Sequence, residues 1–393
     1  MLVLAGGTVV LGAPLRAASH ARELDHVRKV DDGRDASGPL DISSVAFGQR
    51  GRDLEWRVST RAAWSADDLA AEPGRHVCLL IRHGRHGPPD ARLCVQRSKH
   101  AHPFALHYRR LAGGKVKGIR ATVRRDHDRS FDARFSPGSV GLGERGRYGW
   151  RVETSYGHCD GCTDVAPDRG LDGGRLVRVR PLACVASGGH FARYGSRRRR
   201  VVALTFDDGP WTDTPRVLDV LERRHVPGTF FAIGRQVADG AGSLRRELRD
   251  GDVVGNHTWD HRDVSGGGSF ARGEMESTSA AIHGYAGFDT CVFRAPYNDY
   301  SGAQIEEAWR LHMKTVQYDV DPADWSRPGS DAIYSRVVDA VRPGSIVLLH
   351  DGGGDRSETV AALPRIIDEL RRRGYAFATV TDLLGMRVVY GRG

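Results

Sequence analysis

The sequence contains no uninterrupted run of about 18 apolar residues, the length that a membrane-spanning helix requires. It also has little lysine, since only 5 of its 58 basic residues are Lys. This bias toward arginine is typical of genome composition, and no zinc-finger, RRM or basic-region pattern accompanies the formal net charge of +9. We therefore expect no transmembrane span and no nucleic-acid partner.

The chain is nevertheless long and apolar enough to fold into more than one domain. Its 393 residues are 40% hydrophobic, which excludes a disordered chain. Domains average roughly 100–200 residues, so the length predicts two or three of them.

The N-terminus resembles a secretory signal. Residues 2–13 form a short apolar run, and small residues follow it up to position 21. The positively charged start of such signals is missing, so a start further upstream or a buried segment are alternatives. We interpret 1–21 as a signal peptide and expect a secreted or cell-wall-associated protein.

The six cysteines form no pattern typical of a zinc finger. Cys159 and Cys162 form a lone CxxC, and no second pair stands at finger-like spacing. With export, an even count favours disulfides, and a small Cys159–Cys162 loop is one of them. Cys78 and Cys94 lie on two strand-like runs suited to a hairpin, but the sequence alone leaves the pairing open.

The first half of the chain alternates apolar and polar residues. After a polar tether at 22–40, period-two runs separated by Gly, Pro, Asp and Ser clusters recur over 41–186. These runs are Leu54–Val58, Ile119–Val123, Phe131–Phe135 and Tyr148–Val152. Short alternating strands predict an all-β, sandwich-like or jelly-roll accessory domain. Contact with a cell-wall polymer is a hypothesis for this domain.

A basic stretch at 187–200, ending in four arginines, is expected to be a linker. Beyond it the pattern changes, because Val201–Phe206 is a continuous apolar run typical of a strand buried on both faces. Helix-like and strand-like segments then alternate to residue 386. The helices are expected at 215–224, 243–250, 272–283, 301–311, 331–341 and 357–373, and the strands at 229–233, 253–255, 291–294, 314–319, 345–349 and 375–380. This alternation predicts an α/β fold over 201–386, a distorted (β/α) barrel.

Polar residues follow strand after strand in this second half, at the end where barrel enzymes place their sites. The five clusters are Asp207-Asp208-Gly209-Pro210, His257-Thr258-Trp259-Asp260-His261, Arg294-Ala295-Pro296-Tyr297, Asp321-Pro322-Ala323-Asp324-Trp325 and Leu348-Leu349-His350. Each cluster alone is weak evidence, because a turn or a buried core histidine explains it equally well. Five of them at matching strand ends predict one site.

The residue types in these clusters suit metal-assisted hydrolysis. His257 and His261 are four residues apart, so on a helical turn both rings would face one way. Two histidines and one carboxylate give three ligands and leave a coordination position open, as in catalytic zinc sites. A second carboxylate can act as base, another histidine as acid, and Arg294 can hold a carboxylate ionised. This set fits hydrolysis of an amide or an ester.

Residues 201–386 closely resemble the polysaccharide deacetylase family, the NodB-homology domain of carbohydrate esterase family 4. The five clusters match its five ordered motifs: T-F-D-D-G-P at 205–210, H-S/T-x-x-H at 257–261, R-x-P-Y at 294–297, D-x-x-D-W at 321–325 and L-x-H at 348–350. The match covers about half of the chain and leaves the first half unexplained.

The resemblance implies a role for each matching residue. Asp208, His257 and His261 would bind a divalent metal, zinc in the first place and cobalt as an alternative. The other implied roles are Asp207 as general base, Arg294 orienting Asp207, the Tyr297 backbone N–H stabilising the oxyanion, His350 as general acid, Asp324 tuning His350, and Trp325, Leu348 and Pro296 lining the acetyl pocket. Asp321 receives no role.

The implied function is secreted, metal-dependent deacetylation of an N-acetylated glycan, with release of acetate. Peptidoglycan, chitin oligomers and exopolysaccharide are the expected substrates, and the enzyme would be a hydrolase of non-peptide carbon–nitrogen bonds. Two alternatives remain open: O-deacetylation of acetylxylan, and an inactive protein that only binds glycan or cell wall.

Overall fold

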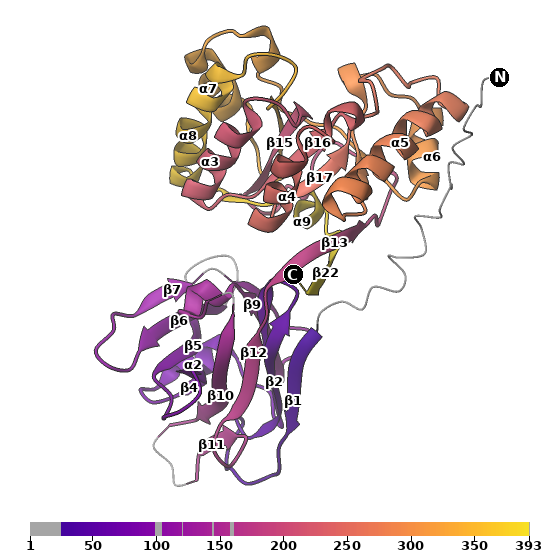
Figure 1. Ribbon diagram of the computed structural model, residues 1–393. Coiled ribbons are helices and arrows are strands. Elements are labelled where there is room, and N and C mark those ends of the chain that lie inside the picture. Colours follow the sequence, from indigo (N-terminus) through magenta and orange to yellow (C-terminus); the bar gives the residue numbers. More distant parts are fainter. Residues whose placement is uncertain (1–24, 99–103, 120, 144, 158–160, 393) are drawn as a thin grey trace, which may run out of the picture. The chain divides into compact units, whose positions relative to one another are not determined.

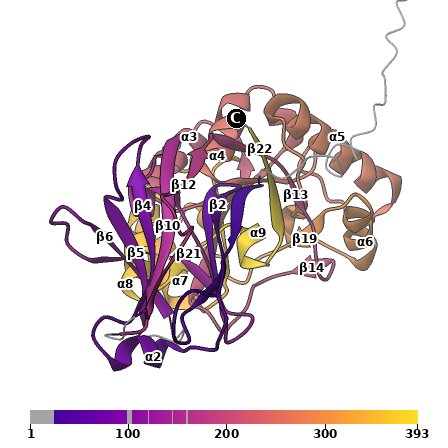
Figure 2. The same ribbon diagram turned by 90° about the horizontal axis from the view of Figure 1, so that it is seen from below.

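The computed structural model describes residues 25–98, 104–119, 121–143, 145–157 and 161–392, so the expected signal segment 1–21 lies outside the described residues. The chain divides into two compact units, shown in Figures 1 and 2. The N-terminal unit ends at Val179 and also includes the chain from Tyr390 onward, and the C-terminal unit comprises Arg180–Val389.

The N-terminal unit consists of two antiparallel sheets. The first has the order β1 (Asp25–Asp31), β2 (Ile42–Arg50), β3 (Asp53–Thr60), β9 (Ser130–Phe135) and β8 (Thr122–Arg124). The second has the order β11 (Thr163–Ala166), β10 (Gly146–Ser155), β4 (His76–His83), β5 (Ala91–Arg97), β6 (Phe104–Arg110) and β7 (Lys117–Ile119), with β12 (Asp172–Leu176) also paired to β10. A short helix, α2 (Ala66–Ala71), and a 3₁₀ turn, η1 (Pro137–Val140), accompany them.

The period-two pattern explains why both sheets share one core. Alternate residues of each strand point the same way, so the apolar members of the strands form one hydrophobic cluster. Phe47 of β2 packs edge-to-face against Tyr148 and Trp150 of β10, with ring centroids 5.5 and 5.7 Å apart. Trp56 and Trp150 are fully buried in this core.

Two expectations for this unit are wrong. The supposed tether at 22–40 contains β1, whose residues pair in register with β2 from Asp25–Arg50 to Asp31–Ser44. The charged residues of this segment suggested a tether. They do not prevent a strand, because an edge strand pairs through its backbone and can carry charged side chains. The run Ile119–Val123 is not one strand either: Ile119 ends β7 in one sheet, whereas Thr122 begins β8 in the other.

The hairpin suggested for Cys78 and Cys94 is present. These residues face each other across β4 and β5 and form a disulfide. Cys162 is also disulfide-bonded, but Cys159 lies outside the described residues, so the small loop stays a prediction.

The C-terminal unit is built on a parallel sheet covered by helices. Its strand order is β14 (Phe191–Ala192), β19 (Lys314–Val316), β18 (Val292–Phe293), β17 (Val253–Asn256), β16 (Gly228–Ala232), β15 (Val201–Gly209) and β20 (Ile346–His350), and β21 (Ala376–Phe377) pairs with β15. The helices are α3 (Thr214–Arg224), α4 (Ala241–Asp250), α5 (Gly268–Ala286), α6 (Gly302–Arg310), α7 (Ser330–Ala340), α8 (Ser357–Arg372) and α9 (Val380–Leu383). Short 3₁₀ turns η2 (Gly234–Gln236), η3 (Pro296–Asn298) and η4 (Asp324–Ser326) follow strand ends, and β13 (Val179–Val185) pairs with β22 (Arg387–Arg392). Figure 1 shows the helices arranged around the strands, and the alternation predicted from the sequence is confirmed.

The parallel sheet curls into an incomplete barrel. The strands pair with their neighbours in parallel, but the outer strands β14 and β20 do not form a ladder with each other. Single bridges lie near this gap, between Tyr194 and Ser345 and between Val320 and Val347. The distorted (β/α) barrel expected for 201–386 is therefore present, with one side open.

The basic linker expected at 187–200 is wrong in part. Phe191 and Ala192 form β14, which pairs with Thr315 and Val316 of β19. The stretch therefore contributes an edge strand to the sheet. The sequence did not predict this strand, because glycines and arginines surround its two residues. A disulfide between Cys184 and Cys291 closes a long loop within the same unit. Among the described residues, every helix is too short or too polar to cross a bilayer.

Candidate active site

The clusters predicted from the strand ends meet at the carboxyl edge of the parallel sheet. Asp207 of β15 lies directly opposite His350 of β20 in the parallel register. His257 follows the last residue of β17, and Arg294 follows β18. Because neighbouring parallel strands end at the same edge, residues from four separate segments converge there.

Asp207 and Arg294 form a buried ion pair. Arg294 Nη1 donates to Asp207 Oδ1 over 2.7 Å and to Thr205 Oγ1 over 2.8 Å, and its Nε donates to the Val316 carbonyl. The Arg294 side chain is fully buried and Asp207 is 4% exposed. Charge-assisted hydrogen bonds of this length hold the Asp207 carboxylate in one orientation.

Asp208, His257 and His261 bring three ligand atoms together. Their nearest donor atoms all lie within 4.8 Å of one another. Asp208 Oδ1 lies 3.2 Å from His261 Nε2 and 3.5 Å from His257 Nε2. The fold therefore brings together the three residues that the sequence predicts as metal ligands.

The two histidine rings reach this cluster by a different route from the one expected. Residues 257–261 do not form a helical turn; they form a loop in which Thr258 and His261 adopt left-handed backbone conformations with φ of 65° and 61°. The rings nevertheless converge, with centroids 5.0 Å apart. The predicted convergence of the two rings is therefore present, but a loop produces it and not the helical turn that we expected.

Two residues that the sequence argument missed hold this loop. The Asn256 side chain accepts from the Thr258 amide and donates to the Met275 carbonyl. Glu274 of α5 is buried and accepts from the Trp259 and Asp260 amides over 2.9 and 3.0 Å. Asn256 directly precedes the 257–261 cluster, so its role could have been predicted from the sequence. Nothing in the sequence around Glu274 indicates its role, because Glu274 lies on α5 and not in the loop that it holds.

The hydrogen bonds of the histidines fit metal binding. His257 Nδ1 lies 2.8 Å from the Arg294 carbonyl, so it carries the proton and the Nε2 lone pair faces Asp208. His261 Nδ1 lies 3.1 Å from the Tyr297 hydroxyl, which itself donates to the His261 carbonyl. Asp208 Oδ1 is a buried oxygen without a hydrogen-bond partner among the described residues. Two oriented imidazole nitrogens and an unpartnered carboxylate oxygen make a donor set that suits zinc.

The charges in the cluster shift one another's pKa values. Burial raises the pKa of Asp208, but the interaction with His257, together with the charges of His350 and His261, outweighs it and brings this pKa well below its usual range. Burial lowers the pKa of His257, but the carboxylates of Asp207 and Asp208 raise it on balance. Burial and the charge of His257 lower the pKa of His261. The carboxylate of Asp208 is therefore ionised and ready to bind a cation.

His350 is paired with Asp324 on the other side of Asp207. His350 Nδ1 lies 2.7 Å from Asp324 Oδ1, and the His350 amide donates to Asp324 Oδ2. Thr359, which the sequence argument missed, also donates to Asp324 Oδ2 over 2.7 Å. Burial lowers the pKa of His350, but the hydrogen bond and the charge of Asp324 have the larger, opposite effect. The pKa of His350 is therefore raised to about 9. An imidazole in this environment is protonated at neutral pH and can donate a proton.

The residues expected to line the acetyl pocket differ in exposure. Leu348 and Pro296 are buried, whereas Tyr297 is 70% exposed and Trp325 is 55% exposed. Tyr297 lies in the left-handed region, with φ of 59°. Leu348 stands two residues before His350 on β20 and opposite Thr205, so Leu348 and His350 share one face of the sheet.

A tightly packed layer lies beneath Asp208. A Cβ at Gly209 would lie 2.2 Å from Asp351 Oδ2, and a Cβ at Gly352 would lie 1.9 Å from the Asp208 carbonyl oxygen. Thr214 donates to Asp351 Oδ2, and burial raises the pKa of Asp351 to about 7. Only glycine fits at these two positions, so they fix the close approach of the two strand ends.

Comparison with known proteins places the resemblance in the second half of the chain. A family model described as polysaccharide deacetylase matches residues 194–316. A peptidoglycan-N-acetylglucosamine deacetylase from Bacillus cereus is 38% identical over 193 residues, which cover 47% of this chain and 88% of that protein. A chitooligosaccharide deacetylase from Sinorhizobium fredii is 42% identical over 187 residues, which cover 44% of this chain and 87% of that protein.

A solved structure of a peptidoglycan N-acetylglucosamine deacetylase is 32% identical to this chain, with a TM-score of 0.49, and the match covers 50% of this chain and 93% of that one. The two curated relatives are matched over most of their own length but over less than half of this chain. The N-terminal unit is thus additional to what these relatives have in common with the chain.

Proposed function

Because this chain belongs to the polysaccharide deacetylase family, we propose that it is a secreted, metal-dependent enzyme that removes acetyl groups from N-acetylglucosamine-type glycans. The observation that carries this proposal is the convergence of a three-residue ligand set, an Arg-paired aspartate and an Asp-paired histidine at one sheet edge. Each of these groups has a distinct part in amide hydrolysis.

Asp208, His257 and His261 are the residues that would hold the metal. Nitrogen and carboxylate ligands suit zinc, and cobalt(II) is an alternative for the same set. When bound, such an ion polarises the acetyl carbonyl and lowers the pKa of a bound water.

Asp207 is the general base in this proposal. Its buried ion pair with Arg294 holds the carboxylate in place, where it can accept the proton of the attacking water. Asp207 Oδ2 lies 3.8 Å from His257 Nε2, which places its second oxygen beside the ligand set. Arg294 contacts Asp207 and acts through it, as a positioning residue.

His350 is the general acid. Its pKa of about 9 keeps the imidazole protonated at neutral pH, so it can donate that proton to the sugar nitrogen as the carbon–nitrogen bond breaks. Asp324 contacts Nδ1 and thereby directs Nε2, the other ring nitrogen, toward the substrate. The backbone N–H of Tyr297 is assigned to the oxyanion, and Trp325, Leu348 and Pro296 to the methyl pocket.

Export is supported by the cysteines. Disulfides persist in oxidising compartments, and Cys78–Cys94 and Cys184–Cys291 are both paired. Sequencing the mature N-terminus of native protein by mass spectrometry tests this part. An N-terminus that still begins at Met1 contradicts removal of a signal at 1–21.

The reaction is tested by measuring acetate release from peptidoglycan, chitin oligomers and acetylxylan in parallel. Metal-stripped protein is assayed with and without added zinc, and metal content is measured in each sample. Zinc-dependent release from a glucosamine-type polymer supports the proposal. Release from acetylxylan alone favours the esterase, and no release from metal-loaded protein favours the inactive glycan-binding protein.

A further inference from the structure

One face of the second sheet in the N-terminal unit carries six arginines. They are Arg82 on β4, Arg92 on β5, Arg109 on β6, Arg147 and Arg151 on β10, and Arg175 on β12. We call this set the arginine face.

The register of the sheet puts these side chains on one side. Arg147 lies directly opposite Arg175, and Arg92 lies directly opposite Arg109. Arg82 lies opposite Gly149, which is two residues from Arg147 and Arg151 on the same strand. Residues opposite each other, or two apart on a strand, share a face, so all six project away from the core.

The positive charge of this face is scarcely compensated. Among the described residues, none of the six arginines forms an ion pair with a carboxylate. Glu153 is the carboxylate close to Arg151 and Arg92; its pKa is lowered, first by the hydrogen bond from His76 and then by these neighbours. Like charges directly opposite each other destabilise a sheet. Two such pairs on one face therefore indicate a role other than stability.

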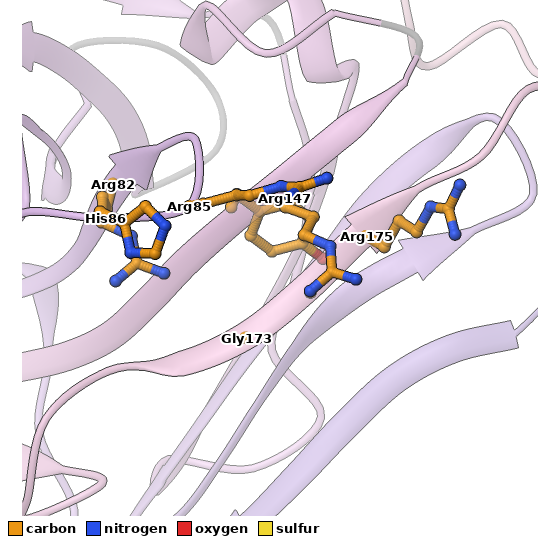
Figure 3. Close-up of a pocket in the computed structure, with 8 residues that line it drawn as sticks. Arg82, Arg85, His86, Arg147, Gly173 and Arg175 are labelled. Carbon is orange, nitrogen blue, oxygen red and sulfur yellow. The ribbon is translucent and has the colours of Figure 1, made fainter.

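A cavity of about 530 Å³ lies at one end of this face. Arg82, Arg147 and Arg175 line it together with Arg85 and His86, and Figure 3 shows their side chains around it. Tyr148 of β10 and Gly173 and Gly174 of β12 also line it, and side chains pack directly against glycines of these strands. A Cβ at Gly149 would lie 2.8 Å from the Arg82 guanidinium, and a Cβ at Gly174 would lie 2.2 Å from the Tyr148 ring.

We propose that the arginine face binds the carboxylates of peptidoglycan and so holds this polymer, rather than chitin, as the substrate. This inference rests on the proposed function, because it selects among the glycans proposed there. Guanidinium groups pair with carboxylates in bidentate fashion. The strands from β12 to β6 lie about 4.8 Å apart, so the face is roughly 19 Å wide and spans several charged groups of a polymer. Peptidoglycan carries carboxylates on its peptide stems, whereas chitin is neutral.

The face is less suited to single-stranded nucleic acid, because such binding relies on aromatic side chains that stack with bases. Tyr148 of β10 lines the cavity but is only 2% exposed, and Trp150 is fully buried, so neither ring offers a face on which a base could stack. Nucleic acid is therefore an outcome of the test and is not the occupant that we propose.

The test measures co-sedimentation of the full chain with purified peptidoglycan from which phosphate-containing polymers have been removed. A metal chelator is present, so that the enzyme does not turn over its substrate during the assay. The variant is Arg147→Gln/Arg175→Gln. The matched control is Arg124→Gln/Arg169→Gln, which removes two exposed charges elsewhere in the same unit. We expect about tenfold weaker binding for the variant and unchanged binding for the control. Chemical amidation of the peptidoglycan carboxylates should weaken wild-type binding similarly, and chitin should bind no better than amidated peptidoglycan.

Two further readouts separate binding from folding and from catalysis. The variant should unfold at the same temperature as the wild type or slightly higher, because a repulsive pair is gone. It should also release acetate from short chitin oligomers at the wild-type rate. Equal binding by variant and wild type, or by native and amidated peptidoglycan, overturns the inference while leaving the proposed function standing. If duplex DNA displaces peptidoglycan from the protein at an equal concentration of negative charge, the inference is overturned and the arginine face is a nucleic-acid binding surface instead. Arginine-dependent binding without acetate release from any substrate defeats the proposed function instead.

Discussion

The two units of this chain place their charged residues in different parts of their sheets. In the parallel sheet, the charged groups stand at the ends of strands, where Asp207 and His350 follow apolar runs buried on both faces. In the antiparallel sheet they stand along the strands, as Arg147 and Arg151 do between the core residues of β10. A parallel sheet covered by helices leaves only its edges available, whereas an antiparallel sheet can leave one face to solvent.

The signs of the charges differ as well. At the strand ends, opposite charges are buried in contact, as in Arg294–Asp207 at 2.7 Å and His350–Asp324 at 2.7 Å. On the arginine face, like charges lie opposite each other without carboxylate partners among the described residues. Buried opposite charges fix protonation states, which chemistry requires, whereas exposed like charges attract a partner of opposite sign.

Asp207→Asn gives the strongest test of the first half of this comparison. If paired charges at strand ends carry the chemistry, kcat for acetate release falls about a thousandfold, because the proton acceptor is lost. Asp321→Asn is the matched control, since Asp321 is exposed and only caps the Ala323 amide. Steady-state kinetics with metal content measured on the same samples checks this, and wild-type turnover in metal-loaded Asp207→Asn refutes the role.

His257→Ala separates metal binding from general base catalysis at the same edge. Removing one of three protein ligands should weaken zinc affinity by more than about a hundredfold, since even supporting partners of ligands are worth 10–100-fold. Competition with a chelating dye measures this affinity. His312→Asn, at an exposed histidine outside the cluster, should keep the wild-type affinity. Stoichiometric zinc held by His257→Ala at that affinity contradicts the ligand assignment.

The disulfides extend the comparison to stability. Cys184 and Cys291 are 107 residues apart, whereas Cys78 and Cys94 are 16 apart. In the chain-entropy account the longer loop stabilises its unit by about 2 kcal/mol more. Amide hydrogen exchange, resolved for each unit, compares Cys184→Ala/Cys291→Ala with Cys78→Ala/Cys94→Ala. Equal losses of free energy of unfolding in the two units would show that loop length does not decide the effect.

Asp324→Asn gives the finest test, through pH. Asp324 raises the pKa of His350 to about 9, so activity that needs a protonated His350 declines as pH rises through about 9. In Asp324→Asn the alkaline limb of the kcat profile should move to lower pH, while in Asp321→Asn it should stay in place. An unmoved limb in Asp324→Asn excludes His350 as the group that titrates there.

The same pair affects stability in a defined pH window. The folded pKa of about 9 exceeds the unfolded value of about 6.5, so the pair stabilises the fold fully below pH 6.5. This stabilisation is lost as pH rises through about 9. Wild type and Asp324→Asn should therefore differ most in unfolding free energy at neutral to acidic pH and converge at alkaline pH.

Much of the C-terminal unit could be predicted because its signals are local. The run Val201–Phe206 becomes β15, and the expected helix at 357–373 becomes α8. Asp207, His257 and Arg294 were expected to meet because neighbouring parallel strands end at one edge, and the sheet brings these strand ends together.

The expectations that failed concern positions where pairing overrides local character. The charged segment Asp25–Asp31 is a strand because β2 offers its backbone, and Phe191–Ala192 is a strand because β19 does. The histidine loop converges through left-handed residues and through Glu274, which lies on another element. The pairing strands β2 and β19 and the side chain of Glu274 cannot be predicted from the residues next to the segments that they hold.

The sequence by itself determined the alternation of elements, the residue types of the site and the family, because these depend on hydrophobic period and on side chains adjacent along the chain. Tertiary structure alone decided which arginines share a face, which cysteines pair and which residues support the ligand loop. Register between strands far apart in sequence sets these relations, and one residue of register moves every side chain to the opposite face.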